Sequence, residues 1–71
     1  MNILDLKTNQ SAEITNVHSK YNRFVKVAEA MGLRKGQQVR LSGRSGRNLI
    51  LSMGGAKIII DREIAKEIEI R

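Results

Sequence analysis

Three short stretches in the second half of this chain have the residue pattern of β-strands, and glycine-containing segments separate the stretches. In residues 38–42, 49–53 and 57–60, apolar side chains recur at every second position, as on one face of a β-strand. Gly54-Gly55 lies between the last two stretches and is typical of the two-residue turn of a tight hairpin. The segment 43–47 has the glycine spacing of a hairpin loop. Three short antiparallel strands are therefore predicted.

Two further strands are predicted nearer the ends of the chain. Residues 12–17 alternate apolar with polar side chains, and Asn16 interrupts the alternation, which indicates a kink or a bulge. Residues 67–70 alternate in the same way. Between residue 60 and this last strand, Asp61 can cap a single helical turn that ends at Ala65.

Residues 21–31 have the spacing of a helix rather than of a strand. Apolar residues recur every three or four positions, and polar or charged residues fill the other face. Ser19 is the expected N-cap, and Gly32 suits the position after the helix because glycine adopts positive φ without steric cost. We expect the apolar face of this amphipathic helix to enter the core through Phe24, Val25, Ala28 and Met31.

The predicted order is a strand, a helix, three strands joined by short turns, a helical turn and a last strand. Short antiparallel strands with long open edges invite aggregation, so we expect closure into a small, mainly β, five-stranded barrel with one inserted helix. With 71 residues, the chain has enough apolar surface for a single domain, residues 1–71. It has no cysteine, so packing rather than disulfides must stabilise the domain.

The groups needed for catalysis or metal binding are scarce. His18 is the only histidine, and neither cysteine nor a carboxylate stands at ligand spacing from it. The carboxylates between residues 61 and 69 are interleaved with Arg62 and Lys66, which is typical of a solvated face. We therefore expect no catalytic residue, no cofactor and no metal site, and the chain is not predicted to be an enzyme.

The sequence also contains no apolar run long enough to cross a bilayer. The first seven residues lack the basic start and apolar core of a signal peptide, so a cytoplasmic location is expected.

Positive charge is concentrated in the middle of the chain. The net charge is +6, and the cations between Lys20 and Arg47 far outnumber the one acid there, Glu29. A basic region of this kind favours nucleic acid, an anionic membrane surface or an acidic protein surface, and it is also compatible with a solvated face that only maintains solubility.

The run from Met31 to Ile70 resembles the FeoA family, the small cytosolic components of bacterial ferrous iron uptake systems. The residues that carry the resemblance are Met31-Gly32-Leu33, Gly36, Val39, Gly55, Ile60, Ala65, Ile68 and Ile70, and Leu4 to Ile14 is similar to the opening strand of the family. The resemblance implies an SH3-like barrel that acts with FeoB, a membrane Fe(II) transporter with a cytosolic GTPase domain. It further implies a protein partner at the cytosolic face of the membrane, to which this chain would be peripheral.

We expect the partner to contact the polar face of the helix through Tyr21, Arg23 and Lys26, and the hairpin through Arg44 and Arg47. Two alternatives stay open, a small basic β-barrel that binds nucleic acid and a stand-alone relative of the C-terminal domain of iron-dependent repressors. Nucleic acid is disfavoured because Tyr21 and Phe24 are the only aromatic residues and the basic residues are scattered. Self-association is left open by the sequence.

Overall fold

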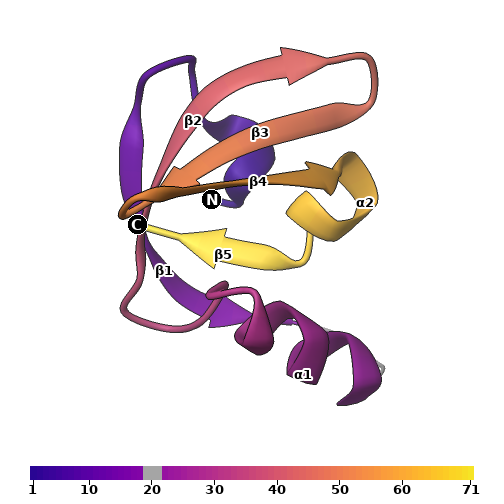
Figure 1. The fold of residues 1–71 in the computed structure, drawn as a ribbon. Coiled ribbons are helices and arrows are strands. Elements are labelled where there is room, and N and C mark those ends of the chain that lie inside the picture. The colour runs from indigo at the N-terminus through magenta and orange to yellow at the C-terminus, as the bar shows by residue number, and fades with distance from the viewer. Residues whose placement is uncertain (19–21) are drawn as a thin grey trace.

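The structure, a computed structural model that describes residues 1–18 and 22–71, contains five antiparallel strands and short helical segments (Figure 1). A 3₁₀ turn, η1 (Ile3–Asp5), precedes the sheet, and helices α1 (Asn22–Ala30) and α2 (Arg62–Ala65) connect strands. The strands are β1 (Ser11–Val17), β2 (Gln38–Ser45), β3 (Asn48–Met53), β4 (Ala56–Asp61) and β5 (Ile68–Ile70). The predicted mainly β architecture, with an inserted helix and a helical turn before the last strand, is confirmed.

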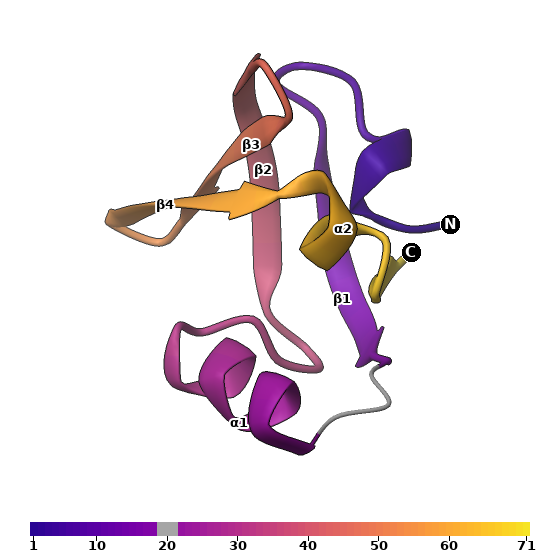
Figure 2. The same ribbon diagram turned by 90° about the vertical axis from the view of Figure 1, so that its right-hand side faces the viewer.

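The strands form one sheet in the order β4-β3-β2-β1-β5. The sheet curls so strongly that β4 and β5, its two edges, are joined by the short α2, while α1 lies outside the curl beyond one end (Figure 2). β1 changes register against β5 between Ile14 and Asn16, which confirms the kink or bulge predicted at Asn16.

The core lies inside the curl and, among the residues that the structure describes, is aliphatic apart from one methionine. Every strand contributes, because the alternating apolar side chains all point to the concave face. No polar or charged residue is buried in the described part of the chain. The buried residues are Ile3, Leu6, Ala12, Ile14, Ala28, Leu33, Val39, Leu41, Leu49, Leu51, Met53, Ile60, Ala65, Ile68 and Ile70.

The hairpin between β2 and β3 is tighter than predicted from segment 43–47. Strand β2 continues to Ser45, which pairs with Asn48, so that the turn consists of Gly46 and Arg47 alone. Gly43 belongs to the strand, where the register against β3 shifts between Leu41 and Gly43. Gly43 therefore lies at a bulge in β2 rather than in the turn. Gly46 has the positive φ (59°) that the turn requires.

Helix α1 ends as predicted, at Gly32. Gly32 has φ 94°, its N–H donates to Glu29 O at 3.0 Å, and the N–H of Leu33 donates to Ala28 O at 2.8 Å. These two bonds define a Schellman motif, which satisfies carbonyls that the end of a helix leaves free. Asp61 likewise caps α2, because its Oδ1 accepts from the N–H of Glu63 at 2.7 Å.

The apolar face of α1 enters the core only in part. Ala28 is buried and Val25 is half-buried, but Met31 is 39% exposed, so its predicted core position is wrong. Met31 follows the last helical residue, and the Schellman turn directs Leu33 into the core instead. The predicted N-cap Ser19 and the side chain of Phe24 lie outside what the structure describes.

Candidate functional site

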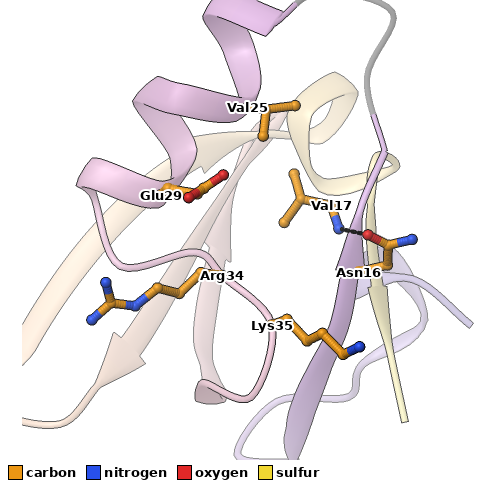
Figure 3. A pocket seen from close by; sticks show the side chains of 6 residues that line it. All are labelled: Asn16, Val17, Val25, Glu29, Arg34 and Lys35. Carbon is orange, nitrogen blue, oxygen red and sulfur yellow. Dashed lines mark hydrogen bonds between the residues drawn. The ribbon is translucent and has the colours of Figure 1, made fainter.

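A pocket of about 250 Å³ lies where α1 passes the end of β1 (Figure 3). Its walls come from three parts of the chain, namely the end of β1, one face of α1 and the turn that leads into β2. The lining residues are Asn16, Val17, Val25, Glu29, Arg34 and Lys35.

Local structure explains why these side chains meet. Val25 and Glu29 are four residues apart and therefore lie on the same face of α1. Asn16 follows the register shift of β1 against β5, and Asn16 Oδ1 accepts from the N–H of Val17 at 2.9 Å. The pocket consequently has an apolar part, Val17 and Val25, and charged groups at its rim.

The turn that carries Arg34 and Lys35 is tied to the sheet. The N–H of Gly36 donates to Ile14 O at 2.7 Å, and the N–H of Gln37 donates to Arg34 O at 3.1 Å. Gly36 has φ 91°, a conformation that suits glycine. The backbone beneath the two cations is thus held in place, while both side chains are exposed.

Two of the predicted partner-binding residues lie on α1. Arg23 and Lys26 are exposed, and Tyr21 lies outside the described residues. We use the name α1 surface for the pocket together with four exposed cations, namely Arg23 and Lys26 on α1 and Arg34 and Lys35 in the turn that follows it. In the described part of the chain, none of the four makes an ion pair within 4.0 Å. Arg34 and Lys35 are not among the predicted partner-binding residues, although their place in a turn next to glycine is typical of recognition loops.

The other two predicted residues, Arg44 and Arg47, lie at the opposite end of the molecule. Figures 1 and 2 place the β2–β3 turn far from α1. The fold therefore does not bring the predicted partner-binding residues into one surface.

Arg44 already has partners within the chain. Its Nη2 donates to Leu4 O at 3.0 Å and to Leu6 O at 2.8 Å, so that it links β2 to the N-terminal η1. Arg47 makes only a weak ion pair with Glu63, because its Nη2 lies 3.7 Å from Glu63 Oε1 and its side chain is 70% exposed. Glu63 pairs more closely with Lys66, at 2.8 Å, and this hydrogen bond lowers the pKa of the Glu63 carboxyl.

His18 has a partner that sequence spacing did not reveal. Its Nε2 is hydrogen-bonded to Glu69 Oε2, and the backbone N–H of His18 donates to Glu67 O at 2.6 Å. The pairing of Asn16 with Glu69 and of Val17 with Ile68 brings the two side chains together. In the described residues no group of three or more His, Cys, Asp or Glu is placed to hold a metal ion, and His18 with Glu69 supplies two ligands at most.

Comparison with known families adds the decisive observation. A model of the FeoA domain matches residues 1–71, the whole chain. The chain belongs to the FeoA family. The family is linked to bacterial ferrous iron transport, and the FeoA domain is a non-catalytic accessory domain, so the resemblance seen in the sequence and the non-enzymatic prediction are confirmed.

Solved structures agree with this assignment. A FeoA iron uptake regulatory protein superposes with a TM-score of 0.90 at 17% identity, over 100% of this chain and 95% of the other. FeoA from Stenotrophomonas maltophilia superposes with a TM-score of 0.87 at 20% identity, over 100% of this chain and 89% of the other. That protein was crystallised with zinc and described as a prokaryotic SH3 domain protein. At these identities the likeness shows the fold, which is SH3-like.

The same fold occurs inside larger proteins. A manganese-dependent transcriptional repressor superposes with a TM-score of 0.92 at 9% identity, over 100% of this chain but only 35% of the repressor. A search of curated protein sequences returned no significant match. In the residues that the structure describes, no helix of this FeoA-family chain is long and apolar enough to cross a membrane.

Proposed function

We propose that this FeoA-family chain is a cytoplasmic accessory protein of bacterial Fe(II) uptake that binds a FeoB-type transporter and modulates its transport or nucleotide hydrolysis. The match of the FeoA domain to residues 1–71 supports the process. The surface chemistry supports a protein partner, because the exposed groups that gather at α1 are suited to contact rather than to bond making or breaking.

The α1 surface is the docking site that we favour. Val17 and Val25 provide apolar contact area at the pocket, and the two exposed cations Arg34 and Lys35 outnumber the one acid, Glu29, in its lining. A segment of the transporter that carries acidic side chains beside one aliphatic side chain matches this arrangement in charge and polarity. Arg23 and Lys26 extend the positive field along the helix and would speed the encounter with such a segment.

Arg44 and Arg47 have different places in this proposal. The guanidinium of Arg44 is bonded to main-chain carbonyls, so removing it would disturb η1 as well as any contact with the transporter. Arg47 is exposed and lies apart from the α1 surface, which would make it a peripheral contact at most.

Binding of the chain to the cytosolic domain of the transporter tests the proposal. The unmodified chain is titrated into that domain at about 150 mM salt, where surface charges more than about 8 Å apart are largely screened. A double variant, Lys26→Glu with Arg34→Glu, is compared with a control, Lys7→Glu with Arg62→Glu, which changes the net charge equally at exposed sites outside the α1 surface.

We expect the unmodified chain to bind and the α1 double variant to lose about tenfold or more in affinity, with about twofold or less for the control. If the unmodified chain binds neither the cytosolic domain nor the full transporter, the proposed function is wrong. If both double variants lose affinity equally, the transporter is the partner but the α1 surface is not the docking site.

The repressor-like alternative has weaker support. The repressor match covers about a third of that protein, and its identity of 9% shows the fold alone. The described residues contain a single helix of more than four residues, so they lack the helix pair of a helix-turn-helix motif, whose second helix enters the major groove of DNA.

A further inference from the structure

Strand β4 forms one edge of the sheet, and β3 is its only neighbour among the strands that the structure describes. The two strands pair in continuous register from Asn48 opposite Asp61 to Met53 opposite Ala56, next to the two-residue turn. No bulge interrupts β4, and the chain contains no proline. Edge strands are usually protected by such features, so a regular six-residue edge is an available template for another strand.

The register identifies which backbone groups are available. Residues that flank a two-residue hairpin turn exchange both backbone hydrogen bonds, which makes Met53 and Ala56 a hydrogen-bonded pair. Because bonded and non-bonded pairs alternate, the N–H and C=O of Lys57 and Ile59 point away from β3. In the described part of the chain, neither residue makes a backbone hydrogen bond to any other loop, turn or cap.

Two side chains on this edge strand, like its backbone groups, are exposed. Lys57 and Ile59 point to the convex face, and Ile59 is 63% exposed, although isoleucine is among the residues most often buried. Ile50 lies directly opposite Ile59 on β3 and is half-buried. The edge therefore combines unpaired backbone groups with an exposed aliphatic side chain.

We propose that β4 pairs antiparallel with β4 of a second copy of this chain, about a two-fold axis that passes through Ile59. In this register Ile59 faces Ile59 of the other copy, and Lys57 faces Asp61 of the other copy on both sides of the axis. The contact is isologous, so it closes after two copies and does not propagate into a fibre.

The charges of Lys57 and Asp61 favour this antiparallel register and favour a second copy of the chain as the partner of β4. A two-fold register centred one residue earlier would set Lys57 opposite Ile59 and form no charge pair across the strands. A parallel arrangement in register would bring Lys57 beside Lys57, which repels. Asp61 uses Oδ1 to cap α2, so its other carboxylate oxygen is the one that can meet Lys57.

The high net charge of the chain does not prevent this contact. The cations of the α1 surface lie on a different part of the molecule, and Lys57 and Asp61 balance each other on β4. One short strand from each copy buries less surface than a standard stable interface does. We therefore expect a dimer that forms at sub-millimolar concentration rather than an obligate dimer.

Analytical ultracentrifugation of the full chain measures the association. We expect the weight-average mass to rise with concentration from 8.0 kDa toward twice that value. Ile59→Lys would set two like charges against each other on the axis, and we expect it to weaken association by about tenfold or more. Val27→Lys is the matched control, because Val27 is also an exposed aliphatic residue but lies on α1, and we expect a change of about twofold or less.

A cysteine on the axis tests the geometry directly. The chain has no cysteine, and the Cα atoms of a hydrogen-bonded antiparallel pair are about 5.5 Å apart, which a disulfide can span. Under mild oxidation, Ile59→Cys should form a covalent dimer about tenfold faster than Val27→Cys at the same concentration.

The proposal is overturned if the mass stays at 8.0 kDa into the millimolar range and Ile59→Cys cross-links no faster than Val27→Cys. It is also overturned if the chain dimerises but Val27→Lys, and not Ile59→Lys, dissociates the dimer, because α1 is then the interface. Circular dichroism monitors folding of each variant. If Ile59→Lys does not fold, Lys57→Glu replaces it, since that change sets Glu opposite Asp61 and should also weaken the dimer.

Discussion

His18 and Glu69 stand 51 positions apart in the sequence, yet their side chains are hydrogen-bonded across β1 and β5. This bond lowers the pKa of the Glu69 carboxyl below its usual 4.5. We expect His18→Ala to return the pKa of Glu69 toward that value, as measured by NMR titration of the Glu69 carboxyl carbon. An unchanged titration curve would show that the two side chains do not interact in solution.

The same bond predicts how stability depends on pH. Because the pKa of Glu69 is lower in the folded chain than in the unfolded chain, its contribution is present above about pH 4.5 and is lost as pH falls through the folded pKa. Thermal unfolding between pH 3 and pH 6 should therefore show a smaller loss of Tm on acidification for Glu69→Gln than for the unmodified chain. An equal slope for both proteins would contradict this prediction.

Gly32 ends α1 with φ 94°, and a Cβ atom there would lie 3.4 Å from Met53 Cε. We expect Gly32→Ala to lower the free energy of unfolding by about 1–2 kcal/mol, because an L side chain is strained in the left-handed region. Urea denaturation measures the change. Gly55→Ala is the control, since Gly55 lacks a positive φ and its Cβ would meet open space, and its effect should be within about 0.5 kcal/mol.

Arg44 and Arg47 should differ sharply on truncation. Arg44→Ala removes both hydrogen bonds to the carbonyls of Leu4 and Leu6, and we expect a loss of about 1.5–3 kcal/mol in the free energy of unfolding. Arg47→Ala removes a long, exposed ion pair and should change stability by about 0.5 kcal/mol or less. Similar losses for the two variants in urea denaturation would mean that the contact of Arg44 with η1 does not stabilise the fold.

Leu51 is fully buried at the centre of β3. Leu51→Ala should cost about 2–5 kcal/mol, through lost burial and the cavity left behind, which is a large part of the stability of a small domain. Val27→Ala on the exposed side of α1 should cost about 0.5 kcal/mol or less by the same denaturation measurement. A small loss for Leu51→Ala would indicate that the core collapses around the cavity.

Only part of the candidate site could be predicted from the sequence. The amphipathic pattern placed Arg23 and Lys26 on the exposed face of α1, and the structure agrees. The pocket lined by Val17 and Val25 could not be predicted, because it depends on how α1 passes the end of β1. The grouping of Arg34 and Lys35 with Val17 follows from the same packing.

The strands, the Gly54-Gly55 turn and the C-terminal end of the long helix could be predicted from local sequence patterns. Alternation at 49–53, the glycine pair at 54–55 and the positive φ available to Gly32 act over neighbouring residues, so they can be read without the fold. The FeoA family, too, was recognisable from the spacing of glycines and aliphatic residues.

Contacts between residues far apart in the sequence depend on how the strands and helices pack. The partner of His18 depends on the register of β5 against β1, the bonds of Arg44 depend on where η1 packs, and Met31 is exposed because the chain turns at Gly32 and buries Leu33. Each of these contacts joins segments whose separation along the chain carries no local signal, and packing of the shared core places them.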